Sequence, residues 1–301
     1  MDIRQMKYFI AVVDESSFTK AAEKLFIAQP PLSRAIQNLE EELEVSLLVR
    51  NTRSIELTEA GKYFYENAKK IVQSNIHLKK MTQQIGGANK TLRIGYIGSA
   101  MYSELAKCIK DYRSLYPDTA IQIKEMNTLT QISTLKSGQI DIGIGRLRTI
   151  DLEIESMVLK EERLFVAFHK EHLLLQGNNN DFIKLEDIVD EPLILFPDTP
   201  QPNFCSNIIE IFSTKMMIPT NLFQPVHDVH SALGLVMSGL GISIVSEGLV
   251  NIYNKDLIFV PLMESFAVTP IILSYRKNES YTLVEDFISI SKKNFSFEDQ
   301  K

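Results

Sequence analysis

Residues 17–61 read SFTKAAEKLFIAQPPLSRAIQNLEEELEVSLLVRNTRSIELTEAG, and this stretch decides the fold of the N-terminal part of the chain. An apolar-periodic helix over 3–13 precedes it, and a short helix beginning near Thr19 ends at a tight turn over 26–28. A longer helix opens at Gln29, where two prolines are tolerated because first-turn amides have no acceptor within the helix. Two helices joined in this way predict a helix-turn-helix, a DNA-binding arrangement.

The second helix of this pair has an apolar stripe, which leaves a polar face for a major groove. The stripe consists of Leu32, Ile36, Leu39 and Leu43. Gln29 and Arg34 have the hydrogen-bonding groups that read base edges, and Ser33 suits a base or a phosphate. The hydroxyl of Thr19 suits a phosphate. The alternative is that these residues are solvated surface positions of a small helical bundle.

After this helix, residues 49–57 read as two short strands around a polar, basic turn. Such a wing would place Arg50 or Arg53 against the DNA backbone or in the minor groove. We therefore predict a winged helix-turn-helix DNA-binding domain over residues 1–58. The acidic residues near the end of the preceding helix lie away from the proposed groove-facing turn.

The next segment is predicted to be a long helix that forms a dimer. From the N-cap Thr58 the chain is helix-prone to about Ile85, and apolar residues recur at seven-residue spacing. The proposed seam contains Phe64, Ala68, Ile71, Asn75, Leu78, Thr82 and Ile85. The alternative is an amphipathic helix packed on its own domain. Residues 86–90 read as a flexible linker, so 59–90 is predicted to be a dimerisation linker helix and hinge.

Beyond residue 90 the pattern changes to alternating strands and helices, which predicts an α/β domain over 91–301. Strands at 92–97, 120–126 and 140–145 with helices between them predict a doubly wound parallel sheet. A second set has strands at 164–169, 193–196 and 241–245, and a strand at 270–275 with a helix at 283–290 returns to the first sheet. We predict two lobes, lobe I at about 91–162 and 268–301 and lobe II at about 163–267.

Three strand ends in lobe I carry groups that suit a small carboxylate. Gly98 and Ser99 follow the first strand, Thr128 follows the second, and Arg146 follows the third. In sheets of this kind, ligands bind outside the carboxyl ends of the strands. Hydroxyls, helix-end amides and one guanidinium form an anion-binding set. Taken one at a time, Ser99 and Thr128 are more often helix caps, so the prediction depends on their convergence with Arg146.

Composition fits a globular protein and excludes several classes. The 301 residues are 45% hydrophobic and 23% charged, with a formal net charge of −6, which does not report the local basic surface that DNA binding needs. We expect a cytoplasmic protein without a membrane partner, because the sequence shows no membrane-spanning run and no signal peptide. Cys108 and Cys205 lack metal-ligand spacing. Without a recognisable catalytic or cofactor motif, we expect no enzyme, no metal and no cofactor.

Several segments resemble the LysR-type transcriptional regulators, and the resemblance covers essentially the whole chain. The N-terminal matches are SFTKAAEKL, AQPPLSR, LEEEL, LLVRNTR and LTEAG. Within the family, IAQPPLSRAIQNLEEEL, LRIGYIGS and IDIGIGRL are similar to the muconate-responsive regulators of aromatic-compound degradation. The resemblance implies DNA-contact roles for Gln29, Pro30, Pro31, Ser33, Arg34 and Arg53. This sequence departs from the family pattern at position 28, where many members have a serine that caps the helix and this chain has Ala28.

The same resemblance implies a type 2 periplasmic-binding-protein fold for 91–301 and effector contacts by Ser99, Thr128 and Arg146. The stretch Pro202, Asn203 and Phe204 matches a family segment that supplies helix-end amides and an aromatic wall. His227, Asp228 and His230 line the cleft or cap a helix. Lys160 stands where a benzoate-responsive relative uses arginine, which makes a second effector site doubtful.

The implied mechanism is that of a homotetramer, built from homodimers, which binds a promoter inverted repeat. An effector would close the cleft, and the protein would then contact RNA polymerase. Two alternatives stay open. One is an architectural DNA-binding regulator without an effector, and the other is a solute-binding or enzymatic domain fused to a helix-turn-helix.

Overall fold

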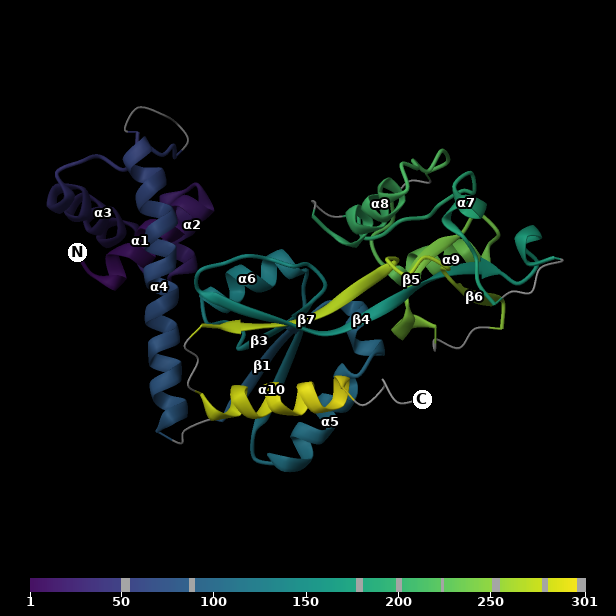
Figure 1. The fold of residues 1–301 in the computed structure, drawn as a ribbon. Coiled ribbons are helices and arrows are strands. Elements are labelled where there is room, and N and C mark those ends of the chain that lie inside the picture. The colour runs from purple at the N-terminus through teal and green to yellow at the C-terminus, as the bar shows by residue number, and fades with distance from the viewer. Residues whose placement is uncertain are drawn as a thin grey trace. The chain divides into compact units, whose positions relative to one another are not determined.

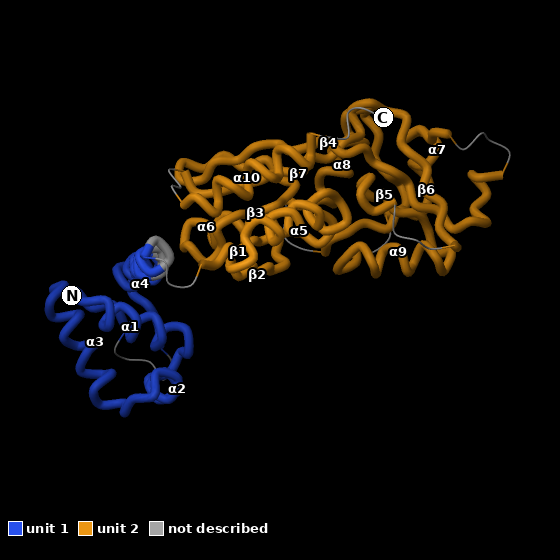
Figure 2. Tube along the Cα trace, turned by 90° about the horizontal axis from the view of Figure 1, so that it is seen from below, with its two compact units in different colours: residues 1–88 blue, residues 89–301 orange. Residues whose placement is uncertain are grey.

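A computed structural model describes residues 1–49, 55–86, 90–176, 181–198, 202–222, 225–250, 255–277 and 281–296. The chain divides into two compact units, Met1–Ala88 and Asn89–Lys301, which Figure 2 shows in different colours. In the described ranges, no helix has both the length and the apolar character needed to cross a membrane.

The described residues of unit 1 form four helices, α1 (Ile3–Glu15), α2 (Phe18–Lys24), α3 (Gln29–Leu43) and α4 (Glu59–Ile85). The carboxylate of Asp2 caps α1 and the hydroxyl of Ser17 caps α2, since each accepts a hydrogen bond from a first-turn amide. Ala28 gives α3 no side-chain cap, as expected from the sequence. The prolines in its first turn need no amide partner, so the helix still forms there.

The core of unit 1 is the packing of α1, α2 and α3, with Phe9, Leu32 and Leu39 fully buried. The segment after α3 returns through an antiparallel bridge between Leu48 and Leu57. This bridge lies where the sequence predicts the strands of a wing, and most of the turn between them is outside the described residues.

Helix α4 packs its N-terminal half on α1. Ala68 and Val72 are buried against Met6, and Phe64 packs beside them. The sequence places Phe64 and Ala68 on a dimer seam, whereas here they contact their own unit. Ile71 and Leu78, from the same seven-residue series, are exposed at 45% and 65%. One face of the first half of the helix therefore fits the alternative of packing within the domain, while Ile71 and Leu78 lie on a face that stays exposed.

In the part of unit 2 that the structure describes, seven strands lie in the order β2-β1-β3-β7-β4-β5, with β6 paired to β4. Their bounds are β1 (Thr91–Tyr96), β2 (Ala120–Glu125), β3 (Ile142–Gly145), β4 (Ile154–His169), β5 (Ser243–Ser246), β6 (Leu257–Pro261) and β7 (Val268–Arg276). Strands β1, β2 and β3 are parallel, and β7 and β4 join them antiparallel. The long β4 then continues into a second sheet with β5 and β6. Two lobes thus share β4, which Figure 1 shows running between them.

The helices of unit 2 cover the two sheets. They are η1 (Gly98–Tyr102), α5 (Leu105–Leu115), α6 (Thr128–Lys136), η2 (Leu173–Leu175), α7 (Leu185–Ile188), α8 (Phe204–Thr214), α9 (Val229–Met237), η3 (Glu247–Leu249) and α10 (Thr282–Phe295). In the first lobe α6 lies on one face of the sheet, and α5 and α10 lie on the other (Figure 1). Tyr112 of α5 packs against Phe287 of α10, with ring centroids 5.5 Å apart.

Unit 2 differs from the predicted arrangement in its first sheet and at residues 193–196. The first sheet is mixed rather than wholly parallel, because β7 returns between β3 and β4 in the antiparallel direction. The predicted strand at 193–196 is not a strand. Its apolar residues are buried, and among the described residues the bridges of this stretch are those of Leu193 to Leu222 and Ile242. A short apolar run fits any buried segment, so periodicity alone cannot separate a strand from a buried connection.

A bulge in β4 decides which side chains point to the site. Val158 pairs with Ile272, but Lys160 pairs with Ile271, so one residue of β4 is extra. Because side chains alternate along a strand, the shift places Lys160 on the face opposite to Val158. Glu162, two residues further on, shares the face of Lys160 and is buried. The bulge therefore presents a cation and a carboxylate to one side of the crossing strand.

Candidate functional site

The predicted DNA-reading residues form an exposed surface at the start of α3. Gln29, Pro30, Pro31 and Arg34 are exposed, and Ser33 is half-buried. Their position follows from the fold, because the opposite face of α3 packs Leu32, Ile36 and Leu39 into the core of unit 1. Thr19 is exposed in the first turn of α2. Arg50 and Arg53, predicted in the wing, lie outside the described residues.

Glu40 has a structural role that the sequence does not reveal. It belongs to the acidic run near the end of α3, yet it is buried, and its carboxylate accepts hydrogen bonds from the amides of Leu47 and Leu48 at 2.6 and 3.0 Å. Charge-assisted bonds of this kind stabilise the backbone more than neutral ones. Glu40 therefore holds the segment that leads into the bridge between Leu48 and Leu57.

In unit 2 the guanidinium of Arg146 is the centre of the candidate effector site. It follows β3, is only 6% exposed, and donates through Nε to Ser99 Oγ at 3.0 Å. Its Nη2 atom donates to Glu162 Oε2 at 2.6 Å and to Ser246 Oγ at 2.9 Å. Among the described residues, the buried Nη1 atom has no hydrogen-bond partner. A buried donor without a partner is costly, and a ligand carboxylate would satisfy it.

Thr128 contacts the backbone of Arg146. It is the first residue of α6, and the amide of Arg146 donates to its Oγ1 atom at 3.3 Å. A methyl group placed on Gly145 would lie 2.6 Å from the same Oγ1 atom, so β3 can approach α6 only with glycine there. Asn127, the preceding residue, caps the helix. The hydroxyl of Thr128 is therefore a contact to the Arg146 backbone rather than a cap.

Ser99 reaches the site from a different kind of element than the sequence predicts. It lies in the 3-10 helix η1, while α5 begins only at Leu105. The preceding Gly98 lies close to a carboxylate, since a methyl group on it would be 2.5 Å from Glu125 Oε1. Ser99 contributes a hydroxyl that already binds Arg146, and it does not stand at the N-terminus of a full α-helix.

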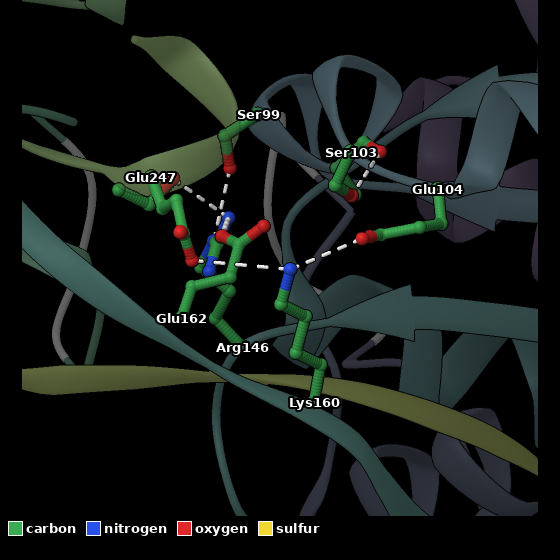
Figure 3. Close-up of polar contacts among 9 residues, drawn as sticks. Ser99, Ser103, Glu104, Arg146, Lys160, Glu162 and Glu247 are labelled. Atoms are coloured by element: carbon green, nitrogen blue, oxygen red, sulfur yellow. Dashed lines mark hydrogen bonds and ion pairs between the residues drawn. The ribbon is translucent and has the colours of Figure 1, made fainter. Parts of the chain in front are cut away.

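Lys160, which the sequence singled out, lies on the bulged strand beside carboxylates that sequence reasoning missed. Figure 3 shows Lys160 between two carboxylates, with Nζ 3.1 Å from Glu104 Oε1 and 3.8 Å from Glu247 Oε2. Glu162, 1% exposed, makes the ion pair with Arg146 in the same cluster (Figure 3). Two cations thus stand among three carboxylates. Any effector carboxylate at Arg146 has to share the guanidinium with Glu162 or displace it.

The second lobe places Asn203 at the start of α8, as the resemblance implies. Asn203 is buried and caps the helix, because its side chain accepts from the amide of Ser206 at 3.0 Å. Phe204 stacks near Phe196, with ring centroids 5.2 Å apart. Pro202 is exposed. This stretch therefore offers an aromatic surface. The Ser206 amide, one of the first-turn amides expected to face a ligand, is already bound by the side chain of Asn203.

Near α9 the three residues singled out from the sequence have separate places. Asp228 caps the helix by accepting from the amide of Ser231 at 2.8 Å, and this hydrogen bond lowers the pKa of its carboxyl. His227 is exposed. Nε2 of His230 lies 3.2 Å from the hydroxyl of Tyr102 in η1. His230 therefore joins the two lobes, whereas Asp228 acts as a cap.

Comparison with known proteins accounts for both units. Residues 3–62 match the bacterial regulatory helix-turn-helix protein model of the lysR family, and residues 86–296 match the LysR substrate binding domain. The transcriptional regulator BenM of Acinetobacter baylyi is 41% identical over 99% of this chain and 97% of its own.

Two solved structures show the same architecture. The BenM effector binding domain with its effector benzoate is 37% identical, with a TM-score of 0.66 over 69% of this chain and 93% of that chain. Full-length CbnR in complex with its target DNA is 28% identical, with a TM-score of 0.75 over 98% of this chain and all of that chain. These relatives are regulators and not enzymes. The chain belongs to the LysR family of DNA-binding transcriptional regulators with an effector-binding domain.

Proposed function

We propose that this regulator is an activator that binds an inverted repeat in promoter DNA and responds to a small carboxylate. Muconate or another acid of aromatic-compound catabolism is the effector that we favour. The observation that carries the proposal is the Arg146 site, where a buried guanidinium keeps one N–H group without a partner among the described residues. Support for the ligand class comes from BenM, whose effector is benzoate.

The proposed binding mode follows from the contacts of Arg146. Its Nη1 atom would donate to the effector carboxylate, and Ser99 would offer its hydroxyl beside it. Because Arg146 also contacts Ser246 at the end of β5, an effector bound there would change a contact between the two lobes. A ligand shifts a conformational equilibrium only when it interacts differently with the two states, and this contact provides such a difference.

The first test measures thermal unfolding of the full chain with muconate, benzoate and salicylate. An acid present at about 100 times its dissociation constant should add roughly 2.7 kcal/mol of stability. We expect Ser99→Ala and Arg146→Lys to reduce this shift. Arg148 is the matched control, because it is an exposed arginine paired with Glu161 at 2.5 Å. Arg148→Ala should keep the shift.

The outcomes separate the alternatives. No shift with any acid would favour a regulator without a carboxylate effector. A shift that survives in both site variants would remove Arg146 from the role proposed here. Arg146→Lys is used rather than alanine because alanine would leave Glu162 buried without its counter-charge.

DNA recognition is proposed to come from α3 in paired subunits. Arg34 is exposed on the face that carries Gln29 and Pro30, so Arg34→Ala should abolish specific binding and leave folding intact. Ile71 and Leu78 remain exposed on α4 and suit a contact with a second copy. We propose a homotetramer assembled from such dimers, which contacts RNA polymerase at the promoter. Unchanged DNA affinity in Arg34→Ala would contradict the role of that residue.

A further inference from the structure

Phe26, in the turn between α2 and α3, combines two features that are unusual in one residue. Its side chain is 95% exposed, and its φ of 55° lies in the left-handed region. The amide of Phe26 donates to the carbonyl of Glu23 at 3.0 Å, and the amide of Ile27 donates to that of Ala22 at 3.0 Å. These hydrogen bonds form a helix-terminating motif in which glycine is the usual residue.

The fold gives no reason for an aromatic residue at this position. A side chain is disfavoured at this φ, and an apolar ring left in water gains nothing from burial. The neighbouring Leu25 and Ile27 both pack against the core of unit 1, whereas Phe26 stays outside it. Glycine would remove the backbone strain and the exposed ring together. A strained residue that does not serve packing is a candidate for function.

The location of the ring indicates which function. The turn leads directly into Gln29, Pro30 and Pro31, which are exposed at the start of α3. In a helix-turn-helix the N-terminal end of the second helix enters the major groove, so the turn before it lies at the edge of that groove. We propose that the Phe26 ring is part of the DNA-binding surface and packs on an apolar part of the duplex. The contact would be a thymine methyl group or a deoxyribose.

This inference rests on DNA binding by unit 1, and the chain supplies a matched control for it. Met216, after α8 in unit 2, has a φ of 55° and is 96% exposed. Its amide donates to the carbonyl of Ser213 at 2.9 Å, and that of Met217 donates to Phe212 at 3.1 Å. The local geometry is the same as at Phe26. What distinguishes Phe26 is its place beside the start of α3.

The test compares Phe26→Gly and Met216→Gly in the full chain. The DNA is a duplex that the wild-type protein selects from a randomised pool. Both variants should keep or raise the thermal unfolding midpoint, because glycine accepts the left-handed conformation. Phe26→Gly should bind DNA about tenfold more weakly, because the apolar contact between the ring and the duplex is lost. The salt dependence of DNA affinity should be the same for Phe26→Gly and the wild type, because the ring neutralises no phosphate. Met216→Gly should bind as the wild type does.

Equal affinity of Phe26→Gly and wild type would overturn the inference. A loss of affinity that appears only with a lowered unfolding midpoint would also overturn it, since the residue would then be structural. If the wild type selects no duplex at all, DNA binding itself fails, which is a different result. Uracil in place of thymine distinguishes the two contacts. The effect of Phe26→Gly should disappear on the uracil duplex for a methyl contact and persist for a sugar contact.

Discussion

The start of α3 and the Arg146 cluster hold their functional side chains in opposite ways. Arg34 and Gln29 are exposed, on a helix whose other face is fixed in the core. Arg146 is buried and bonded to Ser99, Glu162 and Ser246. Under the proposed function, DNA would meet a surface that is already in place, whereas an effector at Arg146 would have to share the guanidinium with Glu162 or displace it. The proposal therefore expects the conformational response in the effector-binding unit rather than in the DNA-reading face.

The largest effect should come from removing the buried counter-charge. Glu162→Gln leaves the guanidinium of Arg146 without its anion at a buried position, and breaking one partner of a buried pair costs about 3–5 kcal/mol. Arg34→Ala changes an exposed residue, so its cost should stay within about 0.5 kcal/mol. Urea unfolding followed by far-UV circular dichroism measures both, because the chain has no tryptophan. Equal stability of the two variants would break the contrast between the regions.

The contrast also explains how much could be predicted from the sequence. The start of α3 was predictable because prolines and an apolar stripe are local signals, and they fix both the helix and its exposed face. The position of Arg146 was predictable from the pattern of β3. Its partner Glu162 was not, because the bulge between Val158 and Lys160 decides which face of β4 carries that carboxylate. Register is a property of the paired strands and leaves no local signal.

The same limit applies to Ser99 and Glu40. A serine after a strand suggests a helix N-terminus, but a five-residue 3-10 helix intervenes before α5. Glu40 sits among acidic neighbours that are exposed, and only the path of the chain after α3 brings the amides of Leu47 and Leu48 to it. In both cases the decisive contact comes from the tertiary arrangement rather than from the residue pattern.

Within unit 1, the segment that leads from α3 to the Leu48–Leu57 bridge also depends on a buried carboxylate, that of Glu40. Glu40→Ala removes the acceptor for two backbone amides and should cost about 2–3 kcal/mol, given the strength of hydrogen bonds to charged groups. Glu41→Ala makes the same change in net charge at an exposed position and should cost almost nothing. Denaturant unfolding and DNA affinity should both fall for Glu40→Ala alone. Equal results for the pair would mean that Glu40 does not hold the segment before the wing.

The smallest effect is expected at Asp228, which caps α9. Its side chain is half-buried, so its burial is intermediate between that of the exposed Arg34 and that of the buried Arg146. The hydrogen bond from the Ser231 amide lowers the pKa of this carboxyl. Its contribution to stability is therefore present above the unfolded pKa of about 3.9, and it is lost as the pH falls through the lower folded value. Asp228→Ala should cost about 1 kcal/mol at neutral pH, because the cap is lost.

Asp228→Asn separates the charge of this cap from its hydrogen bond. Asparagine caps a helix about as well as aspartate, so the variant should stay within a few tenths of a kcal/mol of wild type at neutral pH. Between about pH 5 and pH 3 it should lose less stability than the wild type, since it has no carboxyl to protonate. Thermal unfolding across this range measures the difference. Parallel profiles for wild type and Asp228→Asn would show that the carboxyl gains nothing from its charge at this half-buried site.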